Sequence, residues 1–256
     1  MLAEERRSQI LEVLQDKGSV SVAELYRRLK VSKETIRRDI AKLAGERRLR
    51  KTHGGALSVD SREPDFSERM SQNIEGKRAI GQLAATLVSD GASLFIDSGT
   101  TTLCLAESLM DRHDLAVYTN DIHVAGKLAG RNGNRVVMLG GDLRGNEGAA
   151  YGFDTVRMVK GYLADIAFIG ACAISPHPHL MDYARDAAEF RSQLIEQGRT
   201  AVVLADKTKF NKTPPVQVGG FEEISMIISD EVVPATVIRF CQKNGIETLV
   251  AGNQPA

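Results

Sequence analysis

The spacing of apolar residues changes along the chain and divides it into two regions. Through residues 1–57, apolar side chains recur at intervals of three or four, which is the period of one helical face. From residue 77, short continuous apolar runs alternate with helical patterns. Residues 58–76 keep neither spacing, although Phe66 and Met70 are placed as on an amphipathic turn. We therefore predict a small domain over residues 1–57, a linker over 58–76 and a larger domain over 77–256.

The larger region has the pattern of an α/β fold. Apolar runs without polar alternation are typical of strands that are buried on both faces of a parallel sheet. Because helical patterns lie between most of these runs, we predict a doubly wound, largely parallel sheet with helices on both sides. The predicted strands cover residues 92–97, 115–120, 135–140, 165–170, 200–206, 225–230 and 247–250.

The smaller region predicts three helices and a short basic strand. The first helix covers residues 4–16. Ser21 and Glu24 have the spacing of a capping box at the start of the second helix, and Ser32 is placed to cap the third. Residues 48–52 alternate in polarity like a strand. Helix, turn, basic helix and basic strand follow one another in the order of a winged helix-turn-helix.

Charge is distributed unevenly, although the formal net charge of the chain is zero. Residues 1–56 carry 14 Lys and Arg against 8 Asp and Glu, a net charge of +6, and the remaining residues carry 19 against 25, a net charge of −6. A basic unit attracts nucleic-acid phosphates by counterion release. We therefore expect double-stranded DNA to bind the small region, and the acidic remainder of the chain to have a different function.

The third predicted helix carries the side chains suited to reading DNA. The N-terminal residues of such a helix face base edges in the major groove. Arg37 and Arg38 are expected to pair with guanine and Thr35 to contact a base edge, while the surrounding basic residues hold phosphates. The predicted DNA-binding residues are Ser32, Lys33, Thr35, Arg37, Arg38, Lys42, Arg50, Lys51 and His53.

A solvated, salt-bridged helix is the alternative explanation of the segment KETIRRD, but the order of the surrounding elements favours DNA binding. Glu34 and Asp39 are spaced to pair with arginines of their own helix and to orient them. For His53, a hinge position without DNA contact and a contact from the wing both stay open.

Polar residues at the ends of the predicted strands indicate a ligand site in the larger region. The clearest example is Asp97-Ser-Gly-Thr-Thr-Thr102, which runs directly into a helix. Backbone N–H groups at a helix N-terminus bind anions, and ligands of open α/β sheets gather at the carboxyl ends of the strands. Asp97 would accept hydrogen bonds from sugar hydroxyls, while Lys207 and Lys209 could neutralise a phosphate. Without this context, the segment would read as an ordinary Ser/Thr-rich helix cap.

The motifs VSKETIRRDIAKL and RLRKTHGGA resemble the N-terminal signature of the DeoR family of bacterial transcription regulators. The blocks DSGTTT, YTND, LGGDLR, DIAFIG and ADKTKF resemble its sensor domain, which is similar in fold to ribose-5-phosphate isomerase. This resemblance covers residues 4–250 and implies a repressor of a sugar-catabolic operon that a phosphorylated sugar or polyol controls. The implied effector-binding residues are Asp97, Ser98, Gly99, Thr100, Thr101, Thr102, Thr119, Asn120, Gly140, Gly141 and Lys209.

One segment, SPHPHLMDYARDAAEFRSQLI, departs from that family pattern. His177 and His179 could reach the effector or a metal ion, and the alternative is an exposed loop. Asp182, Asp186 and Glu189 share the acidic role that other members place here. The segment therefore leaves the identity of the effector open.

The sequence also argues against several other classes of protein. Three isolated cysteines at positions 104, 172 and 241 suit buried thiols better than zinc or disulfides. No secretion signal or membrane span is present, so we expect a cytoplasmic protein. A sugar-phosphate isomerase fused to a DNA-binding arm is the rival reading, but no acid/base pair stands out. We expect no enzyme activity, no metal and no cofactor, and a homo-oligomer, either a dimer or a tetramer.

Overall fold

The computed structural model describes residues 2–17, 19–46, 48–52, 54–58 and 63–252. The chain divides into two compact units, the first comprising residues 1–63 and 212–215 and the second residues 64–211 and 216–256. Much of the segment expected as a linker therefore belongs to the second unit. There it forms helix α4 (Phe66–Ser71) and the start of helix α5 (Ile74–Ala85). Phe66 and Met70 pack against the core of that unit, which explains their amphipathic spacing.

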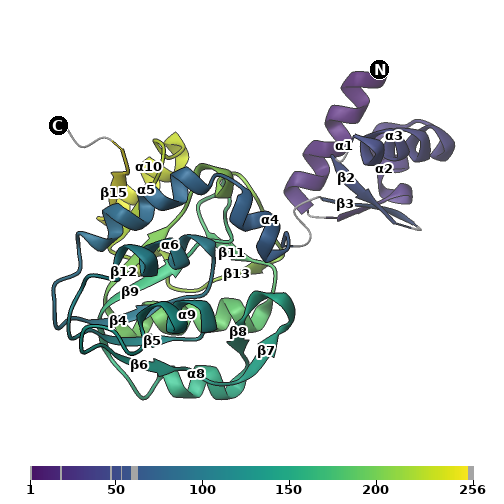
Figure 1. Ribbon diagram of the computed structural model, residues 1–256. Coiled ribbons are helices and arrows are strands. Elements are labelled where there is room, and N and C mark those ends of the chain that lie inside the picture. The colour runs from purple at the N-terminus through teal and green to yellow at the C-terminus, as the bar shows by residue number, and fades with distance from the viewer. Residues whose placement is uncertain (1, 18, 47, 53, 59–62, 253–256) are drawn as a thin grey trace. The chain divides into compact units, whose positions relative to one another are not determined.

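The first unit is the winged helix-turn-helix that the sequence predicts (Figure 1). Three helices pack on a small antiparallel sheet in which β3 lies between β1 and β2. Its elements are α1 (Ala3–Lys17), β1 (Ser19–Ser21), α2 (Val22–Leu29), α3 (Lys33–Gly45), β2 (Leu49–Lys51) and β3 (Gly55–Ser58).

Local signals start and stop the helices of the first unit. The Ser21 hydroxyl accepts a hydrogen bond from the Glu24 backbone N–H at 3.1 Å, and Ser32 caps α3 through the Thr35 N–H at the same distance. Lys30 ends α2 with a φ of 52°, a left-handed conformation that turns the chain towards α3. The apolar faces of the three helices close around one core, whose fully buried members include Ile10, Leu14, Leu25, Ile36, Ile40 and Leu43.

The prediction that Asp39 pairs with an arginine of its own helix is wrong. Asp39 is buried at 5% exposure and binds Arg6 of α1, with 2.5 Å between Arg6 Nε and Asp39 Oδ2. Arg6 Nη2 also donates to Oδ1 at 3.2 Å, and Arg7 lies 3.8 Å from that oxygen. A helix side chain can contact a neighbouring helix that packs against it. The Asp39 carboxylate therefore pairs with Arg6 of α1 and not with an arginine one turn away on α3. The exposed Glu34–Arg37 pair, 3.6 Å apart, does form within α3.

Replacing Arg6 with Met should lower the free energy of unfolding of the first unit by about 1–3 kcal/mol, because the buried Asp39 carboxylate loses its main donor. Chemical denaturation of the full chain, followed by circular dichroism, measures this change. The double variant Arg6→Met/Asp39→Asn removes the unpaired charge and should regain part of the loss. Equal stability of Arg6→Met and the wild type would contradict the role of this contact.

The second unit alternates helices and strands as its sequence predicts. After α4 and α5 come β4 (Ser93–Ile96), α6 (Thr100–Ser108), β5 (Ala116–Thr119), α7 (Ile122–Leu128), β6 (Arg135–Met138), β7 (Asp142–Arg144), β8 (Ala149–Tyr151), α8 (Phe153–Val159), β9 (Ala164–Gly170), β10 (Ala173–Ile174), β11 (Leu180–Asp182), α9 (Arg185–Gln197), β12 (Gly198–Leu204), β13 (Val216–Gln217), β14 (Met226–Ser229), α10 (Ala235–Asn244) and β15 (Glu247–Val250). Short 3₁₀ turns cover Gly145–Glu147, Lys207–Lys209 and Phe221–Glu223.

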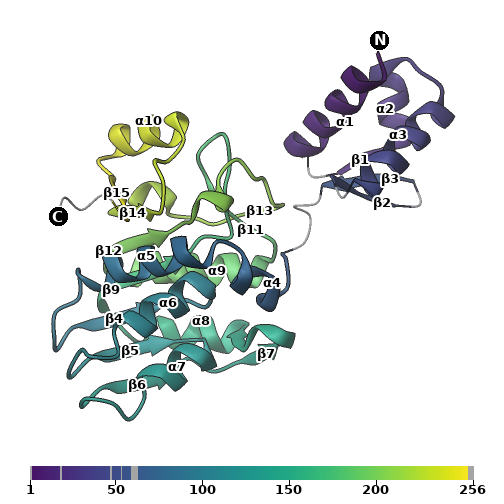
Figure 2. The ribbon, with the colours of Figure 1, turned by 45° about the horizontal axis from the view of Figure 1, so that its top comes forward.

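Seven parallel strands form the central sheet in the order β15-β14-β12-β9-β4-β5-β6. Helices α5, α6 and α7 contribute to the core on one face, and α8, α9 and α10 to the core on the other (Figures 1 and 2). The doubly wound parallel fold is therefore confirmed. From β4 the sheet grows in one direction through β5 and β6, and from β9 in the other, so the strand order reverses between β4 and β9. Such a reversal leaves a crevice at the carboxyl ends of the two strands.

Two small antiparallel sheets complete the second unit, and the sequence pattern did not indicate them. Strands β7 and β8 form a hairpin, and β10, β11 and β13 form a separate three-stranded sheet. Strands of two or three residues contain too few positions for an alternation to be recognised.

Candidate effector and nucleic-acid sites

Helix α3 presents a basic face to solvent. Lys33, Arg37, Arg38 and Lys42 are exposed, while Ile36, Asp39, Ile40 and Leu43 of the same helix are buried. Thr35 is half-buried at the start of the helix, where its hydroxyl lies 2.9 Å from that of Ser32. These side chains have the positions that a DNA-reading helix requires, with the polar residues of its first turns directed away from the core.

The wing adds basic residues beside α3. Arg50 and Lys51 of β2 are exposed, and the neighbouring Leu49 is buried in the core. A groove within the first unit is lined by Arg37 and Ile40 of α3 together with Lys51 and Thr52 of the wing. One residue predicted to read bases, Arg37, and one predicted to bind phosphate, Lys51, therefore line the same groove. His53 lies outside the described residues, so its two possible roles stay open.

In the second unit, the predicted segment 97–102 lies where the strand order reverses. Asp97 directly follows β4 and is fully buried. Its Oδ2 accepts the backbone N–H of Gly170, the last residue of the neighbouring β9, at 3.1 Å. Gly99 has a φ of 143°, which a side chain would strain, and Thr100, Thr101 and Thr102 begin α6 and are buried.

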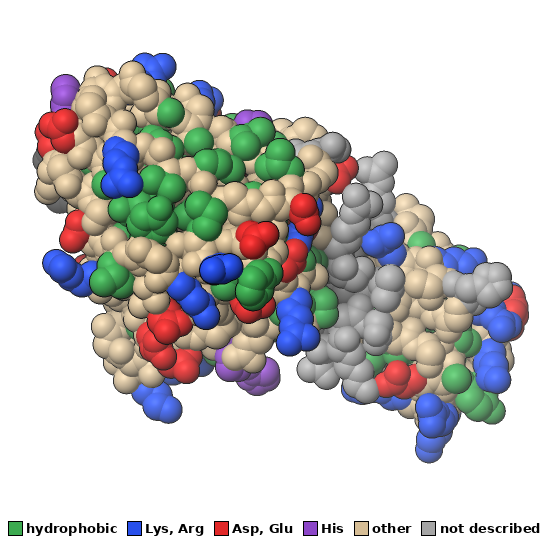
Figure 3. Space-filling view, turned by 90° about the horizontal axis from the view of Figure 1, so that it is seen from below, with side chains coloured by type: hydrophobic (Ala, Val, Ile, Leu, Met, Phe, Trp, Pro, Cys, Tyr) green, Lys and Arg blue, Asp and Glu red, His purple; other side chains and the backbone are tan. Residues whose placement is uncertain are grey.

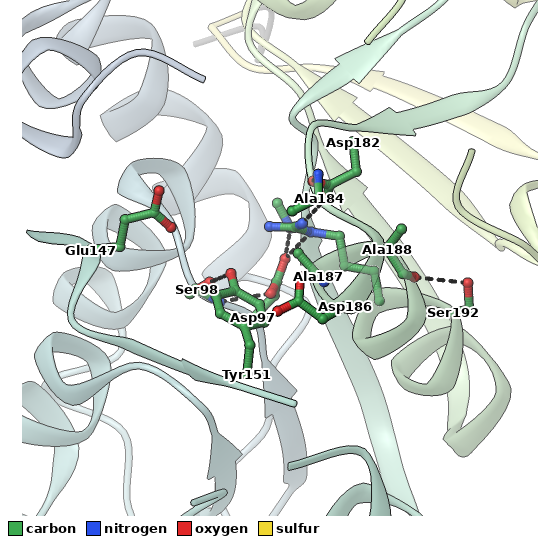
Figure 4. Close-up of polar contacts among 12 residues, drawn as sticks. Asp97, Ser98, Glu147, Tyr151, Asp182, Ala184, Asp186, Ala187, Ala188 and Ser192 are labelled. Atoms are coloured by element: carbon green, nitrogen blue, oxygen red, sulfur yellow. Dashed lines mark hydrogen bonds and ion pairs between the residues drawn. The ribbon is translucent and has the colours of Figure 1, made fainter. Parts of the chain in front are cut away.

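Asp97 has a different environment from the one expected. Arg191 of α9 donates from Nε to Asp97 Oδ2 at 2.8 Å and from Nη1 to Asp182 of β11. The Ser98 N–H donates to the other Asp97 oxygen at 2.8 Å. Figure 4 shows Asp97, Ser98 and Tyr151 gathered at this edge, with Asp182 on the far side of the dashed contacts. Asp97 is fully buried and each of its oxygens accepts at least one hydrogen bond, so its carboxylate holds the β4–α6 turn against β9 and α9, while its contact with an effector stays a prediction.

Burial raises the pKa of Asp97 to about 6, while Arg191 and the backbone donors act in the opposite direction. Because this value lies above that of an unfolded Asp, about 3.9, the contribution of Asp97 to stability is fully present below about pH 4. It is lost as the pH rises through about 6. We therefore expect the wild type to lose stability relative to Asp97→Asn between about pH 4 and 7.

Urea midpoints of the two proteins, taken across that pH range, measure the difference. Asp165→Asn is a control of opposite sign, because hydrogen bonds from Ser93 lower the pKa of Asp165. The wild type should therefore gain stability relative to Asp165→Asn as the pH rises. A pH-independent difference between the wild type and Asp97→Asn would contradict the raised pKa of Asp97.

An aromatic side chain continues the candidate effector site. The hydroxyls of Ser98 and Tyr151 lie 2.6 Å apart, and burial raises the pKa of Tyr151, so that its phenol stays protonated. The guanidinium of Arg144 lies over the Tyr151 ring, 4.4 Å from its centroid, and pairs with Asp186. This chain of contacts connects the start of α6 with the β7–β8 hairpin and α9.

Thr119 and Asn120 lie beside the same turn, at the end of β5. The Thr119 hydroxyl accepts the Asp121 N–H at 3.1 Å, and Asp121 Oδ2 accepts the Gly99 N–H at 3.4 Å. Asn120 is fully buried and donates to the Ala150 carbonyl at 2.9 Å. Its Oδ1 has no hydrogen-bond partner among the described residues. That oxygen is an acceptor for a bound hydroxyl or a water molecule.

The remaining predicted effector residues lie farther along the strand edge. The Gly140 carbonyl accepts the Thr155 hydroxyl at 2.6 Å, and a side chain at Gly141 would lie 2.8 Å from the Tyr151 carbonyl oxygen, so close packing requires this glycine. Lys209 follows β12, and its charge helps to lower the pKa of the buried Lys77, which burial brings to about 8. Within the described part of the chain, no hydrogen bond or ion pair joins Lys209 to the segment 97–102.

The two unusual histidines lie on the turn between β10 and β11. Both side chains are exposed, and the His179 ring contacts the Gln217 amide at 3.1 Å. Across the described residues, no three His, Cys, Asp or Glu side chains cluster as metal ligands. The three cysteines are buried free thiols. None of the described helices has the length and apolar character that crossing a bilayer requires.

Both units match family models. Residues 6–62 match the DeoR-like helix-turn-helix domain, and residues 72–231 match the DeoR C terminal sensor domain. The chain belongs to the DeoR family.

Similar proteins extend this family assignment over nearly the whole chain. The transcriptional repressor GlcR of Bacillus subtilis strain 168 is 31% identical over 98% of this chain and 97% of its own length. The glycerol-3-phosphate regulon repressor of Escherichia coli K12 is 28% identical over 95% and 97%. Among solved structures, ribose 5-phosphate isomerase A of Methanocaldococcus jannaschii aligns with 54% of this chain and 55% of its own, at 20% identity and a TM-score of 0.38.

Sequence reasoning missed Arg191, Tyr151 and Arg144, although they contact residues of the candidate effector site in this DeoR-family chain. The acidic residues Asp182 and Asp186 were recognised, and each now has an arginine partner. The excess of acidic residues in this segment was the only signal in the sequence, because buried carboxylates require a cation or several hydrogen-bond donors.

Proposed function

We propose that this DeoR-family chain represses genes of sugar or polyol catabolism and leaves its operator when a phosphorylated sugar or polyol binds the second unit. The main support is the capped helix α3, which carries Arg37 and Arg38 on the exposed face of a folded winged helix-turn-helix. Two relatives are named as a transcriptional repressor and as a glycerol-3-phosphate regulon repressor, which agrees with this assignment.

The geometry around α6 supports a phosphorylated effector. Backbone N–H groups in the first turn of a helix have no partner within it and favour an anion. The α6 start carries three threonine hydroxyls and follows Gly99, which lets a ligand approach the backbone closely. The Asn120 carbonyl oxygen beside it would accept a sugar or polyol hydroxyl. We assign the phosphate to residues 98–102 and the hydroxyls to Asn120 and its neighbours.

Repression and release follow from linkage between the two ligands. The effector must bind the DNA-free form more tightly than the DNA-bound form, because otherwise it does not shift the equilibrium between the two forms. A tenfold loss of operator affinity requires a difference of about 1.4 kcal/mol between the two. A two-fold dimer would place two α3 helices on successive turns of the major groove.

Binding without turnover fits this site better than isomerase chemistry. A general base at Asp97, whose pKa of about 6 would suit that task, needs a free oxygen beside the substrate. Asp97 is instead fully buried, and its oxygens accept hydrogen bonds from Arg191, Gly170 and Ser98. We therefore assign Asp97 to positioning of the β4–α6 turn.

One experiment separates these functions. A preferred DNA site is selected from a random pool with the full chain, and its affinity is then measured with each member of a panel of phosphorylated sugars and polyols. We expect at least one member to weaken binding by about tenfold without being consumed, and its unphosphorylated counterpart to have no effect. Selection without sequence preference would contradict the repressor, and turnover of a phosphosugar would establish the enzyme.

A further inference from the structure

A groove between α8 and α9 has an unusual combination of exposed side chains. Phe153, the first residue of α8, is 79% exposed, and Val156 lies beside it in the groove. Arg157 and Lys160 provide positive charge from α8 and its end, while Asp186 and Glu189 provide negative charge from α9. Helix α8 lies along the lower side of the second unit in Figure 1. Figure 3, which views that side, shows hydrophobic side chains gathered there with both charge signs around them.

The side chains along α8 are arranged as one contact surface. Phe153, Arg157 and Lys160 follow the i, i+4, i+7 spacing that places residues on one helical face. Arg157, Lys160 and Glu189 are exposed and form no ion pair with other described residues. Asp186, in contrast, is already paired with Arg144. Unpaired charges of both signs around an exposed aromatic ring are suited to a specific contact with another surface.

We propose that this groove is where a second copy of the same chain docks, through a two-fold contact of the α8–α9 surface with itself. In such a contact each patch meets its own copy, so the patch must be self-complementary. The groove meets this requirement, because Arg157 of one copy can face Glu189 of the other, twice over. Glu189 would repel a purely acidic partner, and Arg157 would repel a purely basic one. The proposal needs no DNA and stands independently of the proposed function.

Charge exchange between two copies tests this arrangement. Arg157→Glu and Glu189→Arg each place like charges opposite one another twice in the proposed dimer, so each protein alone should lose assembly. Mixed together, they should assemble, because both contacts then join opposite charges. If Arg157 and Glu189 interacted only within one chain, mixing the two variants would not restore assembly.

Light scattering after gel filtration of the full-length proteins gives the readout. We expect Phe153→Asp to reduce the wild-type mass by about a factor of two or more, with an unchanged circular dichroism spectrum and melting temperature. Val232→Asp changes another exposed apolar residue outside the groove and should leave the mass unchanged. A wild type that is monomeric at every concentration, which would leave a different protein as the occupant, would overturn the proposal. Wild-type assembly of Phe153→Asp, or no assembly in the mixture, would also overturn it.

Discussion

Replacing Arg191 with Met is expected to destabilise the second unit by about 3–5 kcal/mol, because two buried carboxylates lose the cation between them. Arg191 is 4% exposed, and its partners Asp97 and Asp182 are 0% and 1% exposed. Their contacts join β4, α9 and β11, which are distant in the sequence. Denaturant midpoints of the full-length protein, read by circular dichroism, measure the loss.

Two further variants make the Arg191 prediction specific. The triple variant Asp97→Asn/Asp182→Asn/Arg191→Met removes all three charges and should recover most of the lost stability, since buried ion pairs contribute little compared with neutral replacements. Arg199→Met is the matched control, because Arg199 and Asp165 form an exposed pair 3.6 Å apart. Its removal should cost about 0–1 kcal/mol. Equal effects of Arg191→Met and Arg199→Met would show that the buried triad has no special role.

Replacing Arg37 or Arg38 with Ala is expected to weaken binding to the selected DNA site by about 1–3 kcal/mol each, or 5- to 150-fold. Each arginine that reads a base contributes discrimination against the wrong base, so the loss should be confined to one position of the site. Binding to unrelated DNA should change much less. Fluorescence anisotropy with the selected site and with single-base variants of it measures both quantities.

Lys42→Ala separates base reading from phosphate binding on the same helix. Removing a phosphate contact should weaken binding to all sequences alike and reduce the salt dependence of the affinity. Arg131→Ala, an exposed arginine in the second unit, is the neutral control. If Arg37→Ala and Arg38→Ala both bind the selected site as the wild type does, α3 is not the helix that reads DNA.

The contacts of the candidate effector site determine which substitution tests it best. The sequence predicts that Asp97 accepts hydrogen bonds from sugar hydroxyls, which would make Asp97→Ala the direct test of effector binding. Because Asp97 belongs to the buried triad with Arg191, its removal also affects folding. Ser98→Ala is the cleaner choice, since Ser98 contributes a hydroxyl beside Tyr151 and carries no charge. It should weaken effector binding and, because it removes one hydrogen bond and no charge, lower the unfolding midpoint less than the removal of Asp97 does.

The sequence by itself determined the two units and their classes. Caps at Ser21 and Ser32, helical apolar spacing and continuous apolar strands are local signals, and each depends on residues only a few positions apart. The same local signals placed Arg37 and Arg38 on an exposed face and placed residues 97–102 between a strand and a helix.

Only the tertiary structure decided which charges meet and which strand ends are neighbours. Arg6 pairs with Asp39, 33 positions away, and Arg191 with Asp97, 94 positions away. Helix and strand periodicities relate residues only a few positions apart, so they do not predict contacts over such separations. The order β9-β4-β5 in the sheet likewise depends on how the strands assemble. A buried carboxylate needs a cation or hydrogen-bond donors, but the sequence does not state which residues supply them. Local chemistry therefore determined the kinds of site in this protein, and long-range packing determined the partners and roles of their residues.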